Sequence, residues 1–163
     1  MENRVNIHQT TYPVGMIVAG LSGVCYFDEE TQYYYPVPKE YFAIFIEQYT
    51  PGAKVSADLT VTVKANTTTG SKSITAAEGM VYYLESIAFG SFTVTGTYTL
   101  KVDDVTVVEN GTLTSGSTLN IVNLFGNRFR CGKIEIIVTL STAPGSDTNI
   151  PVTATVITKA QAF

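Results

Sequence analysis

Hydrophobic and polar residues alternate with a period of two along much of the chain. Between residues 91 and 101 every even position from Phe92 to Leu100 is apolar or glycine, and the odd positions are polar, mostly threonine. Successive side chains of a strand point to opposite faces of a sheet, so this pattern predicts half-buried antiparallel strands with a threonine-rich outer face. Glycine weakens a strand interior, and we expect a break around Gly96, with Phe92 ending one strand and Tyr98 opening the next.

Similar alternation, or a short apolar run bounded by turn residues, predicts further strands. They are expected at 59–65, 80–89, 98–102, 105–109, 119–125, 133–140 and 150–159. Asp103 and Asp104 form a two-residue hairpin connection, and Asn110-Gly111 is expected to turn the chain again, because these residues tolerate the positive φ of tight turns. No stretch has the pattern of an amphipathic helix.

The number and spacing of these strands predict an all-β protein. Roughly eight to ten strands with turns about every 8 to 12 residues are typical of a sandwich or barrel. About eight antiparallel strands in two sheets is the count of a jelly roll, so we expect a single jelly-roll β-sandwich. The length of 163 residues suits one such domain. We place it at residues 51–163 and interpret residues 1–50 as an N-terminal Tyr-rich arm or a set of added strands.

The first 50 residues lack the threonine alternation and contain seven of the ten tyrosines. The cluster Tyr33, Tyr34 and Tyr35 stands before Pro36, which favours an extended backbone in a rigid loop or edge. Tyrosine is enriched at interfaces because it combines a large apolar ring with a polar tip. We therefore predict that these three residues form a subunit interface. The alternative is that they cover one open end of the sandwich.

Two other segments of this region leave their structure open. The uncharged stretch 13–27 is shorter than the ~20 residues that a membrane-spanning helix needs. The chain also begins without the basic and apolar segments of a secretory signal. We expect 13–27 to be a buried strand or an extended arm, and contact with a membrane surface stays open. Segment 39–49 is expected to be a strand or a short helix.

Charged residues make up only 15% of the chain, against a usual ~25%, so its polarity is mostly hydroxyl. Soluble monomers use surface charge to stay apart, and this composition therefore favours association with other protein. The net charge of −4 argues against a nucleic-acid partner. The nearest basic group is Arg128, Arg130 and Lys133, which fits a strand edge or a subunit contact better than a nucleic-acid-binding face.

No grouping of residues indicates a reaction, so we expect no enzyme activity, no metal and no cofactor. The single histidine, His8, cannot supply the ligand cluster of a cupin or the base of a nucleophilic triad. The carboxylates that glycoside hydrolysis would need are better explained by turns, as at Asp103 and Asp104. No glycine-rich phosphate loop precedes a helix.

Cysteines and asparagines supply the remaining candidates. Cys25 and Cys131 are favoured as two reduced, buried residues, and a disulfide between them stays open. Sequons begin at Asn66 and Asn110, both in expected loops, where a glycan could be carried.

Two segments together resemble a known family. Residues 78–87, Glu-Gly-Met-Val-Tyr-Tyr-Leu-Glu-Ser-Ile, and 97–105, Thr-Tyr-Thr-Leu-Lys-Val-Asp-Asp-Val, are similar to a stretch that recurs in jelly-roll proteins of phages and archaeal viruses. In that family a Gly often follows the Asp of the hairpin, and Asp104 takes its place here. The resemblance implies a virion structural protein, a capsid, penton or spike subunit made in the host cytoplasm. Its partners would be copies of itself and other virion proteins.

Two other functions remain as alternatives to a self-assembling capsid or penton subunit. One is a carbohydrate-binding or host-receptor attachment module, such as a spike head, which would bind a glycan receptor. The other is a pilus or surface-layer subunit that exchanges strands between protomers.

Overall fold

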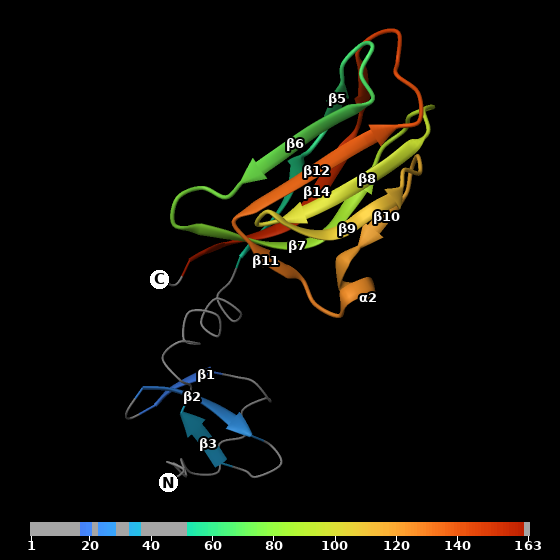
Figure 1. The fold of residues 1–163 in the computed structure, drawn as a ribbon. Coiled ribbons are helices and arrows are strands. Elements are labelled where there is room, and N and C mark those ends of the chain that lie inside the picture. The colour runs from blue at the N-terminus through green and yellow to red at the C-terminus, as the bar shows by residue number, and fades with distance from the viewer. Residues whose placement is uncertain (1–16, 21–22, 29–32, 37–51, 162–163) are drawn as a thin grey trace. The chain divides into compact units, whose positions relative to one another are not determined.

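The computed structural model describes residues 17–20, 23–28, 33–36 and 52–161 (Figure 1). The chain divides into two compact units, residues 1–51 with 160–163, and residues 52–159. The described strands of the first unit are β1 (Ile17–Gly20), β2 (Gly23–Asp28) and β3 (Tyr33–Pro36), which form an antiparallel sheet in the order β1-β2-β3. The stretch 13–27 thus contains β1 and most of β2, and segment 39–49 lies outside the described residues.

The second unit confirms the all-β prediction. Its elements are β4 (Ala53–Asp58), β5 (Val61–Val63), β6 (Thr69–Thr75), β7 (Met80–Phe89), β8 (Gly96–Val102), β9 (Val105–Thr112), β10 (Thr118–Asn120), α2 (Ile121–Phe125), β11 (Phe129–Cys131), β12 (Lys133–Leu140), β13 (Thr148–Ile150) and β14 (Val152–Ala160). One sheet has the order β10-β7-β14-β4, with β11 also paired to β7, and the other has the order β6-β12-β8-β9. β5 and β13 form a separate antiparallel pair.

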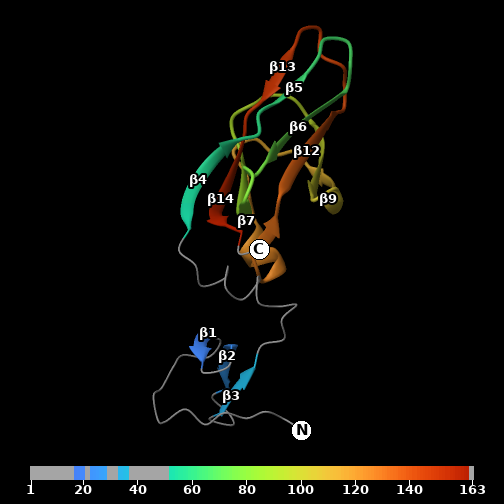
Figure 2. The same cartoon turned by 90° about the vertical axis from the view of Figure 1, so that its left-hand side faces the viewer.

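The two larger sheets lie as layers with the core between them (Figures 1 and 2). Alternate residues of the central strands point into this core, as in β12, where Ile134, Ile136 and Val138 are fully buried. Leu84 and Ile87 of β7 and Val156 of β14 are fully buried in the same core cluster. The period-two pattern of the sequence therefore gives each sheet one apolar face, and burying both faces against each other makes a β-sandwich.

The threonine-rich stretch that follows β7 is only partly a strand. β7 and β12 match the predicted ranges 80–89 and 133–140, but residues 90–95 form a connection, so the prediction that Phe92 ends a strand is wrong. Phe92 and Val94 still pack against the core. The backbone N–H of Phe92 donates to the hydroxyl of Ser115, and the carbonyl of Thr95 accepts from Ser141. An extended loop with such partners shows the same alternation as a strand.

The two predicted turns of this region have different outcomes. Asp103 and Asp104 both have positive φ, 48° and 65°, and connect β8 to β9 as predicted. Asn110-Gly111 does not turn the chain, because β9 continues through both residues. Asn110 has a φ of 51°, and the register of β8 and β9 shifts here as in a β-bulge. A Cβ on Gly111 would lie 2.7 Å from ring atoms of Tyr98, so the glycine makes room for that ring.

Three other predicted strands are shorter than expected or interrupted. The range 119–125 is wrong as a strand, because β10 ends at Asn120 and α2 follows. The side chain of Asn120 accepts a hydrogen bond of 2.9 Å from the backbone N–H of Asn123, and Gly126 ends the helix with a φ of 82°. Within 150–159, Pro151 separates β13 from β14, and within 59–65 only Val61–Val63 is a strand.

Asp103 is expected to stabilise the sandwich beyond its own turn. Its Oδ1 accepts hydrogen bonds from the backbone N–H groups of Gly132 (2.9 Å) and Lys133 (2.8 Å), which tie the hairpin to the start of β12. Asp103→Ala removes both bonds and places alanine at positive φ, so we expect a loss of about 2 kcal/mol in the free energy of unfolding by urea. Asp103→Asn keeps an acceptor oxygen and tolerates this φ. Equal losses in the two variants would contradict this role.

Candidate functional site

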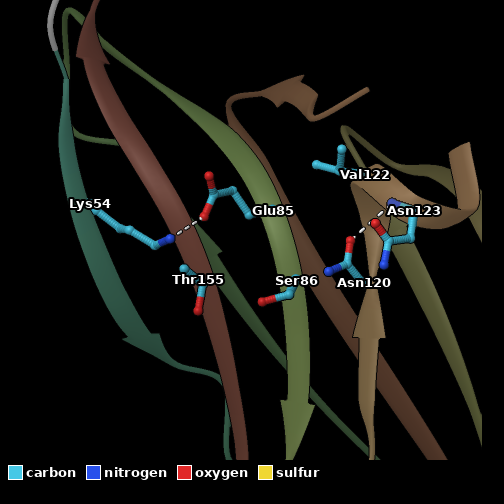
Figure 3. Close-up of a pocket in the computed structure, with 7 residues that line it drawn as sticks. All are labelled: Lys54, Glu85, Ser86, Asn120, Val122, Asn123 and Thr155. Atoms are coloured by element: carbon cyan, nitrogen blue, oxygen red, sulfur yellow. Dashed lines mark hydrogen bonds and ion pairs between the residues drawn. The ribbon is translucent and has the colours of Figure 1, made fainter. Parts of the chain in front are cut away.

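A polar pocket of about 400 Å³ opens on the outer face of the sheet that contains β7 and β14 (Figure 3). Four elements besides β7 contribute to it, because the sheet brings together segments distant in sequence. The lining residues are Lys54 of β4, Glu85 and Ser86 of β7, Asn120 of β10, Val122 and Asn123 of α2, and Thr155 of β14.

The floor of the pocket departs from regular strand alternation. Glu85 and Ser86 are consecutive, yet both are only partly buried and line the pocket, while Leu84 and Ile87 on either side are fully buried. A regular strand would turn one of the two central residues into the core. The local irregularity instead places a carboxylate and a hydroxyl side by side on the outer face.

The rim of the pocket is made by an interruption in the neighbouring strand. Asn120 of β10 pairs with Ser86, and Phe129 of β11 pairs with Leu84, so both strands border β7 at the same edge. The chain between them forms α2 and the following turn. This insertion carries Val122 and Asn123 beside the pocket.

Glu85 is held between two cations. Its Oε2 lies 2.7 Å from Nζ of Lys54, and its Oε1 accepts a 2.7 Å hydrogen bond from Nε of Arg128. The Glu85 side chain is 14% exposed, whereas Lys54 and Arg128 are 67% and 46% exposed. The hydrogen bond from Lys54 lowers the pKa of Glu85 below its ordinary value, partial burial opposes this, and Arg128 adds to the lowering. The carboxylate is therefore ionised at neutral pH and joins β4, β7 and the segment before β11.

Glu85 is expected to make stability depend on pH in the acid range. Its pKa is lower in the folded chain than the ordinary 4.5, so its contribution is present above that pH and is lost as the pH falls through the folded-state pKa. Glu85→Gln should lose about 1 kcal/mol at neutral pH, a value limited by solvent screening of the exposed cations. The difference from wild type should shrink as the pH falls below 4.5, as measured by urea unfolding.

A carboxylate elsewhere on the surface provides the control for the stability lost in Glu85→Gln. Glu109 is exposed on β9. Glu109→Gln removes the same charge without breaking the contacts with Lys54 and Arg128, so it should lose less stability at neutral pH than Glu85→Gln. A constant difference between Glu85→Gln and wild type over the whole acid range would contradict the role of the ion pairs.

The residues singled out from the sequence do not meet in this pocket. Tyr33, Tyr34 and Tyr35 lie in β3, the last strand in the described order β1-β2-β3, where they pair with Asp28, Phe27 and Tyr26. Their role as a subunit interface stays a prediction.

The predicted glycosylation sites lie in the second unit. Asn66 and Asn110 are both exposed and both have positive φ, in a loop and in the bulge of β9 respectively. Their modification stays a prediction.

The remaining singled-out groups have structural surroundings. Cys131 is a free, fully buried thiol whose pKa is raised to about 12, mainly by burial, so it is protonated at neutral pH. Lys133 forms an ion pair with Asp104 at 2.7 Å. His8 lies outside the described residues. Within the described ranges, no three side chains of His, Cys, Asp or Glu gather into a metal-binding group.

Sequence reasoning did not find the pocket. Its residues belong to separate strands, and their only local signal was the consecutive polar pair Glu85-Ser86 inside an otherwise apolar strand. Asn120, Val122 and Asn123 fell within the range 119–125, which was predicted to be a strand. The pairing of Glu85 with Lys54 and Arg128 depends on sheet order, which period-two alternation does not specify.

The described residues belong to an all-β protein whose antiparallel sheets form a sandwich. No helix within the described segments is long and apolar enough to cross a membrane. Comparison with protein families, curated proteins and solved structures found no match to this chain.

Proposed function

We propose that the second unit is a single jelly roll and that the chain is a self-assembling structural subunit of a virion. The observation that carries this proposal is the nesting of its strand pairs. β4 pairs with β14, β6 with β12, β7 with β10, and β8 with β9. When these strands are taken in chain order, the first pairs with the last and the second pairs with the second-last. The pairing continues inward in this way to the adjacent strands β8 and β9. A long antiparallel hairpin rolled into two sheets has this order, which is that of a jelly roll.

Chemistry narrows the functions that such a fold carries. Jelly rolls occur in viral capsid proteins, lectin domains and cupins. A cupin metal site needs several histidines, and the chain has one. The resemblance of residues 78–87 and 97–105 to viral jelly-roll proteins favours the capsid role, with the fold serving as an analogy and not as proof of function.

The outer face of the sheet β6-β12-β8-β9 offers a surface for contact between copies. Thr139 of β12 pairs with Thr69 on one side and with Thr97 on the other, and Thr97 pairs with Thr112 of β9. One row of threonines therefore crosses all the strands of the sheet. We call this row the threonine row. The next row toward the middle of β12 is Ser71, Ile137 and Thr99, also without charge.

The occupant that fits the threonine row best is a second copy of the same chain. A hydroxyl both donates and accepts hydrogen bonds, so a threonine row can pair with itself across a two-fold axis. Along β8 and β12, charges begin at the row where Glu135 pairs with Lys101, and opposite charges within one row are also self-complementary. On β9, the exposed Glu109 lies between Val108 and Gly111, beside Thr99 and outside the threonine row. No like charges would face each other at the threonine row. Strand β3, with Tyr33 to Tyr35, is the second predicted contact.

Electron microscopy and sedimentation velocity of the purified full chain test this proposal. Shells, rings or closed caps made of many copies are expected. A monomer at high concentration would overturn the proposal, and long filaments would overturn it in favour of a pilus or surface-layer subunit.

Two matched variants test the threonine row. Thr139→Lys places like charges against each other at the contact, so we expect at least a tenfold smaller assembled fraction. Thr153→Lys adds the same charge at an exposed threonine of β14, in the other sheet, and should assemble as wild type does. Unchanged assembly of Thr139→Lys would overturn the choice of this surface. Urea unfolding of both variants shows whether the fold is retained.

A further inference from the structure

The pocket on the outer face of β7 and β14 carries polar groups that the fold does not use. The hydroxyls of Ser86 and Thr155 and the side-chain amide of Asn123 have no hydrogen-bond partner within the described part of the chain. The Oδ1 of Asn120 accepts the bond from Asn123 N–H, which leaves its NH₂ group free to donate. Figure 3 shows these groups together, with the Lys54–Glu85 ion pair on the side of the pocket opposite Asn120 and Asn123.

Two irregularities of neighbouring strands converge on this hollow. In β7 the consecutive pair Glu85-Ser86 lies between buried Leu84 and Ile87. At the neighbouring position of the sheet, α2 separates the two short strands β10 and β11, which both pair with β7. Neither feature is needed to close a sandwich, because regular strands bury the same core faces. Departures from local regularity of this kind concentrate at functional sites.

The lining chemistry selects the class of ligand. Hydroxyl and amide side chains can both donate and accept hydrogen bonds. They therefore match a ligand that carries several neighbouring hydroxyl groups, since each of those also donates and accepts. Val122, 37% exposed at the rim, offers an apolar contact for C–H groups. Lys54 is already paired with Glu85, and none of the described residues that line the hollow is aromatic, so a small anion or a stacked base is less well matched. The volume of about 400 Å³ falls within the range of small-ligand sites.

We propose that this pocket binds one saccharide unit of a glycan, with Ser86, Asn123 and Thr155 hydrogen-bonding to its hydroxyls. This site is distinct from the threonine row, since the two lie on different sheets of the sandwich. The proposal does not depend on the assembly of the chain into a virion. It gives a glycan-binding role to residues that no feature of the sequence had suggested.

The labelled full chain applied to a glycan array, with neutral and sialylated glycans, tests the proposal. Binding of at least one glycan is expected, with affinity then measured by calorimetry on the free oligosaccharide. Ser86→Met fills the hollow from its floor and should weaken binding at least tenfold. Thr155→Val removes one hydroxyl at nearly constant volume and should weaken binding about fivefold.

Thr153→Val is the matched control, an exposed threonine two residues earlier in β14, outside the pocket. It should bind as wild type does. The absence of binding to every glycan would overturn the proposal, and so would binding that survives both Ser86→Met and Thr155→Val. Electron microscopy of the same preparations separates the two proposals, because assembly without glycan binding contradicts only the pocket, and glycan binding without assembly contradicts only the virion role.

Discussion

Gly96→Ala is expected to destabilise the sandwich by about 3 kcal/mol, although it adds a single carbon atom. Gly96 opens β8 opposite Leu140 of β12. A Cβ at this position would overlap the backbone carbonyl oxygen of Thr139 and would lie 2.9 Å from Cα of Leu140. Backbone atoms of a paired central strand cannot move aside as the end of a flexible side chain can, so the strands must separate locally. The midpoint of urea unfolding measures the loss.

Gly145→Ala provides the control for this effect. Gly145 lies in the connection between β12 and β13, and nothing stands within 4 Å of its Cβ position. We expect a change near zero, or a small gain from the reduced freedom of the unfolded chain. Similar unfolding midpoints for Gly96→Ala and Gly145→Ala would contradict the close approach of β8 and β12.

Ile136→Ala is expected to lower the free energy of unfolding by about 2–5 kcal/mol. Ile136 is fully buried in β12, with β6 on one side and β8 on the other. Its removal loses apolar burial and leaves a cavity that the two neighbouring strands cannot close. Thermal and urea unfolding of the purified variant, followed by circular dichroism, give the loss.

The next residue of the same strand is its control. Ile137 points to the outer face and is only partly buried, so Ile137→Ala should lose less than about 1 kcal/mol. The ratio of the two losses reports directly on which face of β12 meets the core. Equal losses would mean that the period-two assignment of faces in this strand is wrong.

Alternation predicted strands well where the chain was regular and failed where the backbone carried special conformations. The strands β7 and β12 have the predicted ends, and the Asp103-Asp104 hairpin lies between the predicted strands. Asn110-Gly111 has the composition of a turn, but its role depends on Tyr98 across the strand pair, whose ring needs a residue without Cβ at Gly111. A rule based on neighbouring residues in the sequence does not include Tyr98, which meets Gly111 only through strand pairing.

The short helix α2 shows a second kind of failure. Its apolar residues satisfy a strand pattern as well as a helix pattern, since five residues are too few to separate the two periods. The cap at Asn120 and the glycine at Gly126 were the available signals of a helix. The interpretation of Gly96 from the sequence was also incomplete. It does mark the start of a strand, but its physical reason is the close backbone of β12 and not flexibility.

The candidate site depended on tertiary structure even more strongly than the strands did. Lys54, Glu85 and Arg128 come from three distant parts of the sequence. They meet only because the sheet has the order β7-β14-β4 and because β11, which follows Arg128, also pairs with β7. Nothing in the local pattern of any one strand predicts such a meeting. The free hydroxyls and amides of the pocket became evident only once their surroundings were known.

By itself, the sequence determined that the chain is all-β, which face of most strands is apolar, and that its polarity comes mainly from hydroxyl groups. These properties follow from side chains that alternate along one strand and from composition. Only the tertiary structure decided which strands are neighbours, that Thr69, Thr139, Thr97 and Thr112 form one row, and that a polar pocket opens beside β7. The physical reason is that a strand's own pattern specifies its faces, whereas its edges pair with whichever strands let both sheets bury their apolar faces together.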